Sequence, residues 1–88
     1  MSVSMHVTLV TPTSEVKYDQ VVSIVVKTAM GEIGVLPRHR HLLAQLANKG
    51  TLRVRIQDGQ EYTYQIGEGV IEVEPASVRI LTEHASLV

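Results

Sequence analysis

The chain contains no cysteine, no tryptophan and no phenylalanine among its 88 residues. Without cysteine it has no disulfides, no thiolate nucleophile and no cysteine-based metal site. Its only aromatic side chains are three tyrosines, so the core must be built from aliphatic residues, and aromatic platforms for stacking nucleotide bases are lacking. These absences exclude enzymes that use a cysteine nucleophile or a cysteine-bound metal. They also argue against binding of single-stranded nucleic acid by base stacking.

The net charge is small, and long apolar runs are missing. Eight basic and nine acidic residues give a formal net charge of −1, so no strong field directs the protein toward nucleic acid or anionic lipid. The sequence shows neither a signal peptide nor an apolar run of about 18 residues, the length that spans a membrane. We therefore expect any membrane association to be made through a partner protein.

The residues that are abundant favour β-structure. Fourteen valines, seven threonines and six isoleucines have branched side chains that suit a pleated, half-buried surface. A chain of this length can bury one modest core, so we expect a single domain spanning residues 1–88. Short strands at 8–12-residue spacing indicate a β-sandwich or a β-barrel.

The pattern of apolar residues locates several strands. Residues 5–11 and 50–56 alternate between apolar and polar side chains, as half-buried strands do. Residues 21–28 are almost continuously apolar, which predicts a strand covered on both faces or one that bends from one sheet to another. Residues 42–47 have helical spacing, but this run is too short to form a stable helix alone.

Two hairpins can be placed in register, because apolar residues must face the same side of a sheet. A three-residue loop at 57–59, closed by Gly59 in the left-handed conformation, meets this requirement for the first hairpin. A turn at 74–77 with Pro75 in its second position meets it for the second. The expected pairs are Leu52 with Tyr64, Val54 with Tyr62, Arg55 with Glu61, Ile71 with Ile80, Glu72 with Arg79 and Val73 with Val78.

No recognisable motif supports catalysis or a cofactor. His39 and His41 lie between arginines in the loop at 31–43, where a metal ion would need a third ligand and would meet positive charge, so we expect no metal. The glycines at 67–69 are followed by neither a dinucleotide-binding nor a phosphate-loop pattern, and they predict a tight corner. A nucleophile elbow and a Ser/His/Asp order are missing. We expect neither an enzyme nor a cofactor.

Four arginines support an alternative hypothesis. Arg38, Arg40, Arg53 and Arg55 could form a patch through which a free-standing small β-barrel or sandwich binds nucleic acid or another protein. Acidic residues in the same hairpins make a solvated sheet face the simpler expectation. Taken alone, the residues indicate a β-sandwich with an exposed, partly apolar loop, which is typical of a protein-interaction module.

The whole chain resembles the epsilon subunit of F-type ATP synthase, specifically its N-terminal β-sandwich domain, called delta in the mitochondrial enzyme. The resemblance is carried by residues 7–12 (VTLVTP), 31–37 (GEIGVLP), 39, 42–43, 52–56 (LRVRI), 69–73 (GVIEV) and 78–82 (VRILT). The family usually has Gly-His-Ala-Pro-Leu-Leu at 38–43, where this chain has Arg-His-Arg-His-Leu-Leu, and Ser-Gly-Gly at 67–69, where it has Gly-Glu-Gly. The implied fold class is all-β, an antiparallel sandwich of two packed sheets with about ten short strands.

The resemblance also implies a function. Such a subunit is a non-catalytic part of the central stalk, or rotor, of a proton-translocating ATP synthase. It links the gamma subunit to the membrane rotor (c) ring, meets the alpha/beta hexamer indirectly and helps couple proton flow to ATP synthesis. The implied location is peripheral, in the F1 sector on the cytoplasmic side of the bacterial inner membrane. The implied ring contacts are Ala29, Met30, Gly31, Glu32, Ile33, Arg38, His39 and Arg40, and the implied gamma contacts are Thr11, Ala44 and Gln45.

Most members of this family continue into a C-terminal helical hairpin that restrains ATP hydrolysis and in some members binds ATP. Residues 83–88 are too few to form a stable helix alone. We therefore expect these 88 residues to lack that hairpin and the activities that depend on it.

Overall fold

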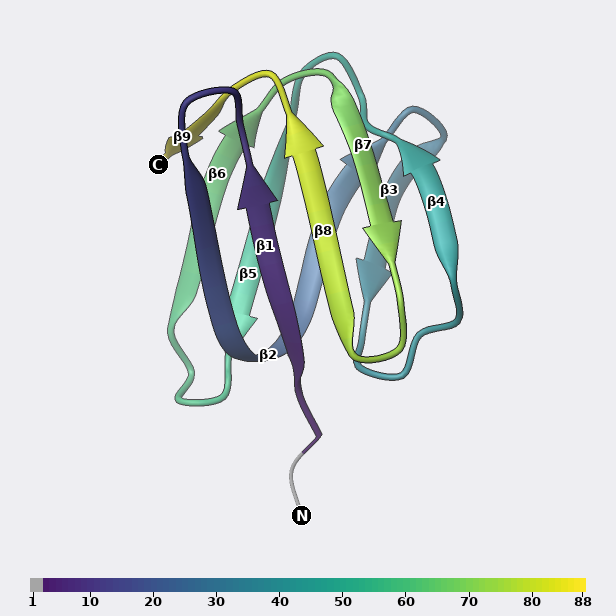
Figure 1. Ribbon diagram of the computed structural model, residues 1–88, viewed down its shortest axis with the longest axis vertical. Coiled ribbons are helices and arrows are strands. Elements are labelled where there is room, and N and C mark those ends of the chain that lie inside the picture. The colour runs from purple at the N-terminus through teal and green to yellow at the C-terminus, as the bar shows by residue number, and fades with distance from the viewer. Residues whose placement is uncertain (1–2) are drawn as a thin grey trace.

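The computed structural model describes residues 3–88, which form strands, turns and loops (Figure 1). Within this range there is no helix that could span a membrane. The all-β prediction is confirmed, with nine strands in the described residues where about ten were expected. They are β1 (Met5–Val10), β2 (Glu15–Thr28), β3 (Gly31–Val35), β4 (Leu42–Gln45), β5 (Gly50–Ile56), β6 (Glu61–Ile66), β7 (Gly69–Val73), β8 (Ser77–Thr82) and β9 (Ala85–Leu87).

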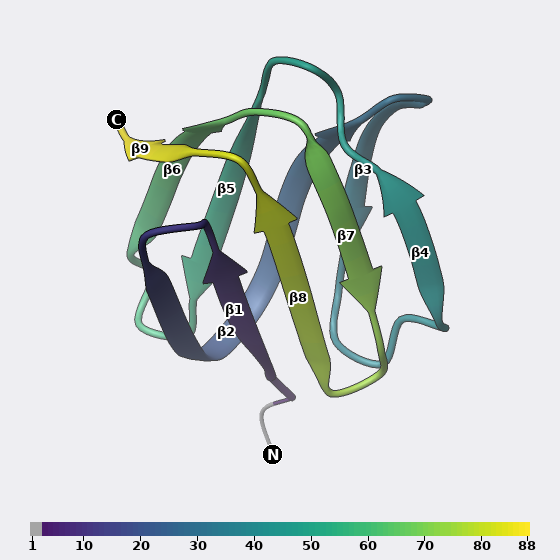
Figure 2. The same cartoon turned by 45° about the horizontal axis from the view of Figure 1, so that its top comes forward.

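The strands form two layers that share β2 (Figures 1 and 2). The first half of β2 pairs with β1, and its second half pairs with β3 and β5. We call the layer β4-β7-β8-β1-β2 the front sheet and the layer β3-β2-β5-β6-β9 the back sheet. Strand β2 passes between them near Gln20, whose φ is 58°, and its register with β5 shifts just after Val21. The apolar run at 21–28 therefore belongs to a strand that bends between sheets, one of the two predicted alternatives.

Strand β1 makes the one parallel pairing among the described strands. It lies between β2, to which it is antiparallel, and β8, to which it is parallel, with Val7 opposite Val78. The resemblance implied two antiparallel sheets, and this one pairing departs from that expectation. The β7–β8 hairpin makes β8 antiparallel to β7, and in this direction β8 runs parallel to β1.

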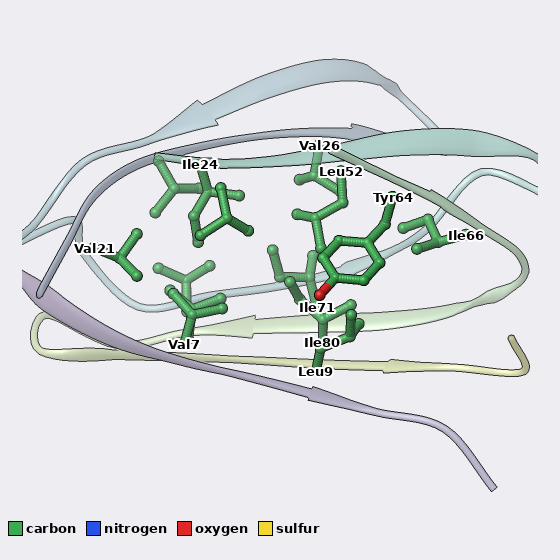
Figure 3. Close-up of a cluster of buried hydrophobic side chains, with 14 of the residues drawn as sticks. Val7, Leu9, Val21, Ile24, Val26, Leu52, Tyr64, Ile66, Ile71 and Ile80 are labelled. Atoms are coloured by element: carbon green, nitrogen blue, oxygen red, sulfur yellow. The ribbon is translucent and has the colours of Figure 1, made fainter. Parts of the chain in front are cut away.

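The core fills the space between the two sheets (Figure 3). Leu52 and Ile24 of the back sheet and Ile80 of the front sheet are fully buried, at 0% exposure. Burying an aliphatic side chain of this size contributes about 1.5–3 kcal/mol. The buried apolar residues are Met5, Val7, Leu9, Val21, Ile24, Val26, Val35, Leu46, Leu52, Val54, Tyr64, Ile66, Ile71, Val73, Val78 and Ile80.

Both predicted hairpin registers are confirmed, including every expected pair. In the first, Gly59 has a φ of 94° and its N–H donates to the carbonyl oxygen of Ile56 at 3.0 Å. In the second, the N–H of Glu74 donates to the carbonyl oxygen of Ser77 at 2.8 Å. These registers could be predicted because one face of each hairpin is buried and the other is exposed.

Strand β4 occupies the run whose spacing suited a helix. It pairs with β7, with Leu42 opposite Val73, so its backbone groups find partners in the sheet. Just beyond it, the N–H of Leu46 donates to the carbonyl oxygen of Gly69 at 2.9 Å. A Cβ atom on Gly69 would lie 1.8 Å from the carbonyl oxygen of Leu81, so the predicted tight corner admits only glycine here.

The three tyrosines close one side of the sandwich, where the first half of β2 faces β6. The rings of Tyr18 and Tyr62 lie 5.0 Å apart between centroids, and the hydroxyl of Tyr18 is hydrogen-bonded to that of Tyr64. Burial of the Tyr18 hydroxyl and its bond to Tyr64 raise the pKa of Tyr18 above its usual value.

Candidate functional site

The turn between β2 and β3 presents an apolar side chain to solvent. The hydroxyl of Thr28 donates to the carbonyl oxygen of Gly31 at 2.7 Å and accepts the N–H of Met30 at 3.1 Å. Thr28 itself is 4% exposed, whereas the side chain of Met30 is 97% exposed. A turn held in this way from inside and carrying an unburied Met is suited to contact another protein.

Strand β3 continues from this turn along an edge of the back sheet, pairing in the described structure with β2. Glu32 is exposed and lies opposite Lys27, while Ile33 packs against the core. The structure therefore brings together the first five predicted ring contacts, residues 29–33, in one hairpin.

The other predicted ring contacts lie at the opposite end of β3 (Figure 1). The N–H of Arg38 donates to the carbonyl oxygen of Pro75 at 2.8 Å, and that of His39 donates to Leu36 at 3.2 Å. The Nδ1 atom of His39 is 2.7 Å from the carbonyl oxygen of Arg40, to which it donates. The predicted ring set is thus divided between the two ends of one edge strand.

Between β3 and β4 lies an apolar groove of about 440 Å³. Leu43 on its β4 side is 71% exposed, and Ile33 and Leu42 are half-buried within it. Two predicted gamma contacts, Ala44 and Gln45, line the same groove. Three predicted ring contacts, Ala29, Met30 and Ile33, line it as well, so part of each predicted set lies in one groove.

Thr11, the third predicted gamma contact, follows β1 at the far side of the front sheet. Its hydroxyl accepts the N–H of Ser14 at 3.1 Å and stabilises the turn to β2. Strands β8 and β7 lie between β1 and β4, so Thr11 is not adjacent to Ala44 or Gln45.

A row of apolar side chains nevertheless links these distant contacts. Across the front sheet, Val10 pairs with Leu81, Leu81 with Val70, and Val70 with Gln45. We call Val10, Leu81 and Val70 the apolar row. Val70 is 39% exposed and Leu81 is 37% exposed, on a sheet face where polar residues are usual.

Sequence reasoning missed the apolar row, although a signal was present. In the predicted strands around Ile71 and Ile80, the inward positions are already apolar. The neighbouring outward positions, Val70 and Leu81, break the alternation and could have been recognised as an unpaired apolar face.

The four arginines of the alternative hypothesis are not gathered. Arg53 and Arg55 are exposed on β5, on the outer face of the back sheet, and Arg55 Nη2 lies 3.4 Å from Glu61 Oε2. Arg38 and Arg40 lie in the loop after β3, and β2 separates β3 from β5. The structure therefore shows mixed charge on the sheet face rather than a basic patch.

Among the described residues, histidines meet carboxylates only in pairs, such as His6 with Asp19 at 2.7 Å. Across residues 3–88, no three side chains of His, Asp or Glu are placed to hold a metal ion. His39 and His41 lie in the loop between β3 and β4, where His39 is half-buried and His41 is exposed.

Comparison with known proteins gives one consistent result. The family model described as ATP synthase, Delta/Epsilon chain, beta-sandwich domain matches residues 4–88. An ATP synthase epsilon chain of Legionella pneumophila (strain Lens) is 37% identical over 86 residues, which is 97% of this chain and 60% of that protein. One of Nitrosococcus oceani is 33% identical over 85 residues, with the same coverage of both chains.

A solved structure agrees with these relatives. A chain in the cryo-EM structure of Euglena gracilis mitochondrial ATP synthase, which contains OSCP, F1 and the c-ring, has a TM-score of 0.89 and 28% identity. The match covers 99% of this chain and 55% of that one, so the present chain spans little more than half the length of such relatives. Because the family match runs through all nine described strands, this chain belongs to the ATP synthase delta/epsilon family and forms its β-sandwich domain.

Proposed function

We propose that this chain is a non-catalytic rotor subunit of an F-type ATP synthase, which joins gamma to the membrane rotor ring and couples proton flow to ATP synthesis. The observation that carries the proposal is the similarity to epsilon chains over 97% of the sequence. The structurally similar Euglena chain belongs to a complex that includes F1 and the c-ring, which is the kind of assembly proposed here. Attachment to the membrane is peripheral and made through these partners, on the cytoplasmic side of the bacterial inner membrane.

The proposed role is mechanical, and the core suits it. A densely packed interior of branched aliphatic side chains has low compressibility and transmits force between its surfaces. Strand β2 runs through both sheets and ties them together covalently. A domain built in this way can transfer torque without contributing a chemical group.

Gamma is proposed to dock on the front sheet along the apolar row. The row extends from Val10, beside Thr11, to Val70, which is paired with Gln45. Covering Leu81 and Val70 removes apolar surface from water at about 25 cal/mol per Å². This placement gives the separated residues Thr11, Ala44 and Gln45 a common partner.

The rotor ring is proposed to meet the edge formed by β3 and its two flanking loops. Met30 and Glu32 lie at the start of β3, and Arg38 and Arg40 lie in the loop beyond its end. The groove between β3 and β4 lies along the same edge and provides apolar contact area.

The proposal is tested with ATP synthase from which epsilon has been removed. The 88-residue chain is added, and its co-purification with gamma, the catalytic hexamer and the rotor ring is followed together with proton-driven ATP synthesis. We expect recovery with all of these partners. Failure to bind gamma, combined with salt-dependent binding of an oligonucleotide, would favour the nucleic-acid hypothesis instead.

A further inference from the structure

The loop after β3 holds an arginine in a conformation that glycine adopts more readily. Arg38 has a φ of 69°, in the left-handed region, which is uncommon for residues with a side chain. Its N–H is fixed by the carbonyl oxygen of Pro75 in the β7–β8 turn. Retaining a strained residue where glycine would be unstrained points to a use for the side chain.

Within residues 3–88, the guanidinium groups of the two arginines in this loop form no ion pair. Arg38 and Arg40 are exposed, and the ion pairs of the described residues involve neither of them. Glu72 and Glu74 line a neighbouring hollow together with His41, yet they are not paired with either guanidinium. Both guanidinium groups are therefore free to bind an external anionic group.

The surroundings indicate a protein partner rather than a lipid surface. Leu36 before the arginines is 61% exposed, and Leu43 after them is 71% exposed. Arginine beside exposed apolar residues is typical of protein interfaces. Anionic membranes are recognised by clusters of about four to eight basic residues, whereas here the acidic Glu72 and Glu74 lie close by.

We propose that Arg38 and Arg40 recognise carboxylates on the rotor ring, with Leu36 and Leu43 supplying apolar contact beside them. This inference rests on the proposed function and specifies the chemistry of its partner. A planar guanidinium matches a carboxylate through two parallel hydrogen bonds. Glu32 lies at the other end of β3, opposite Lys27, so the arginine loop is a charged contact separate from Glu32.

The variant that tests the site is Arg38→Gly with Arg40→Ala. Glycine relieves the left-handed strain at position 38, so the variant should unfold at a temperature no lower than the wild type. The matched control is Arg53→Ala with Arg55→Ala, which removes the same charge from the outer face of the back sheet.

Each protein is assembled with gamma and the catalytic hexamer, and its binding to purified rotor rings in phosphatidylcholine vesicles is measured at several salt concentrations. We expect the 38/40 variant to bind about tenfold more weakly and to depend less on salt. The 53/55 control should stay within about twofold of the wild type.

Equal binding by the 38/40 variant and the wild type would overturn the site while leaving the proposed function intact. Absence of wild-type binding would overturn both. Protein-free vesicles rich in anionic phospholipid provide the last comparison. If they bind the wild type as tightly as the ring does, and with the same dependence on Arg38 and Arg40, the partner is lipid and the inference is wrong.

Discussion

The backbone N–H of Ala29 donates a hydrogen bond of 2.8 Å to the carbonyl oxygen of Gln45. It joins the β2–β3 turn of the back sheet to the end of β4 in the front sheet. The N–H of Ala47 donates likewise to the carbonyl oxygen of Lys27 at 3.2 Å, so backbone hydrogen bonds join the surfaces proposed for the rotor ring and for gamma. Force applied at one of them can reach the other without crossing the core.

The ring contact is tested by reversing the charge of Glu32. Glu32→Lys should change the free energy of unfolding by no more than about 1 kcal/mol, because Glu32 and its opposite residue Lys27 are both exposed. It should nevertheless weaken attachment to the ring and lower proton-driven ATP synthesis in reconstituted vesicles. Glu61→Lys is the control, because Glu61 is also exposed and also lies opposite a basic residue, Arg55, on the outer face of the back sheet. A Glu32→Lys protein that couples as well as the wild type would refute the contact.

The gamma contact is tested at the centre of the apolar row. Leu81→Lys should preserve the fold, since the stem of lysine can lie along the sheet, but it should weaken binding of isolated gamma about tenfold or more, which is about 1.4 kcal/mol. Gln65→Lys, exposed on the back sheet, is the matched control. Titration calorimetry gives both affinities, and equal values would place gamma elsewhere.

The assignment of inner and outer faces is tested on β5. Val54 is 0% exposed, so Val54→Asp should reduce the free energy of unfolding by more than about 3 kcal/mol, because a charge would enter the core without a partner. Arg53→Asp, one residue away on the outer face, should cost less than about 1 kcal/mol. Denaturant unfolding measures both, and similar midpoints would contradict the assignment.

The tyrosine cluster predicts a loss of stability in alkali. The pKa of Tyr18 is raised in the folded chain by burial and by the bond to Tyr64. Above about pH 10, the unfolded chain loses this proton while the folded chain keeps it, so stability falls as the pH rises. Urea unfolding at neutral and alkaline pH should show a steeper loss for the wild type than for Tyr18→Phe. Equal slopes would mean that Tyr18 is not responsible.

Much of the fold was predictable because one face of each strand is buried. The alternation around Leu52 and Val54 determined the β5–β6 register, and Ile71 and Val73 did the same for β7–β8. The exchange of β2 between sheets remained one of two alternatives, because its apolar run fits either arrangement. The parallel pairing of Val7 with Val78 involves residues far apart in sequence and has no local signature.

The candidate site was less predictable, since contact surfaces depend on which outward-facing residues become neighbours. The resemblance identified Ala29 and Gln45 as parts of different contacts, and only the topology shows that they touch. The left-handed backbone of Arg38 could not be predicted from the sequence either. Its backbone N–H donates a hydrogen bond to Pro75, a residue in a turn distant in sequence.

The pairing of β1 with β8 has a consequence for synthesis of the protein. Strand β1 leaves the ribosome early, but one of its two neighbours is made only after most of the sandwich. The β2–β3 and β5–β6 hairpins are local and can form during translation, whereas the front sheet must wait for residues 77–82. Until then, one side of β1 is an open edge that other chains can pair with. We therefore expect the nascent chain to aggregate most readily just before β8 pairs with β1 beside Val7 and Leu9.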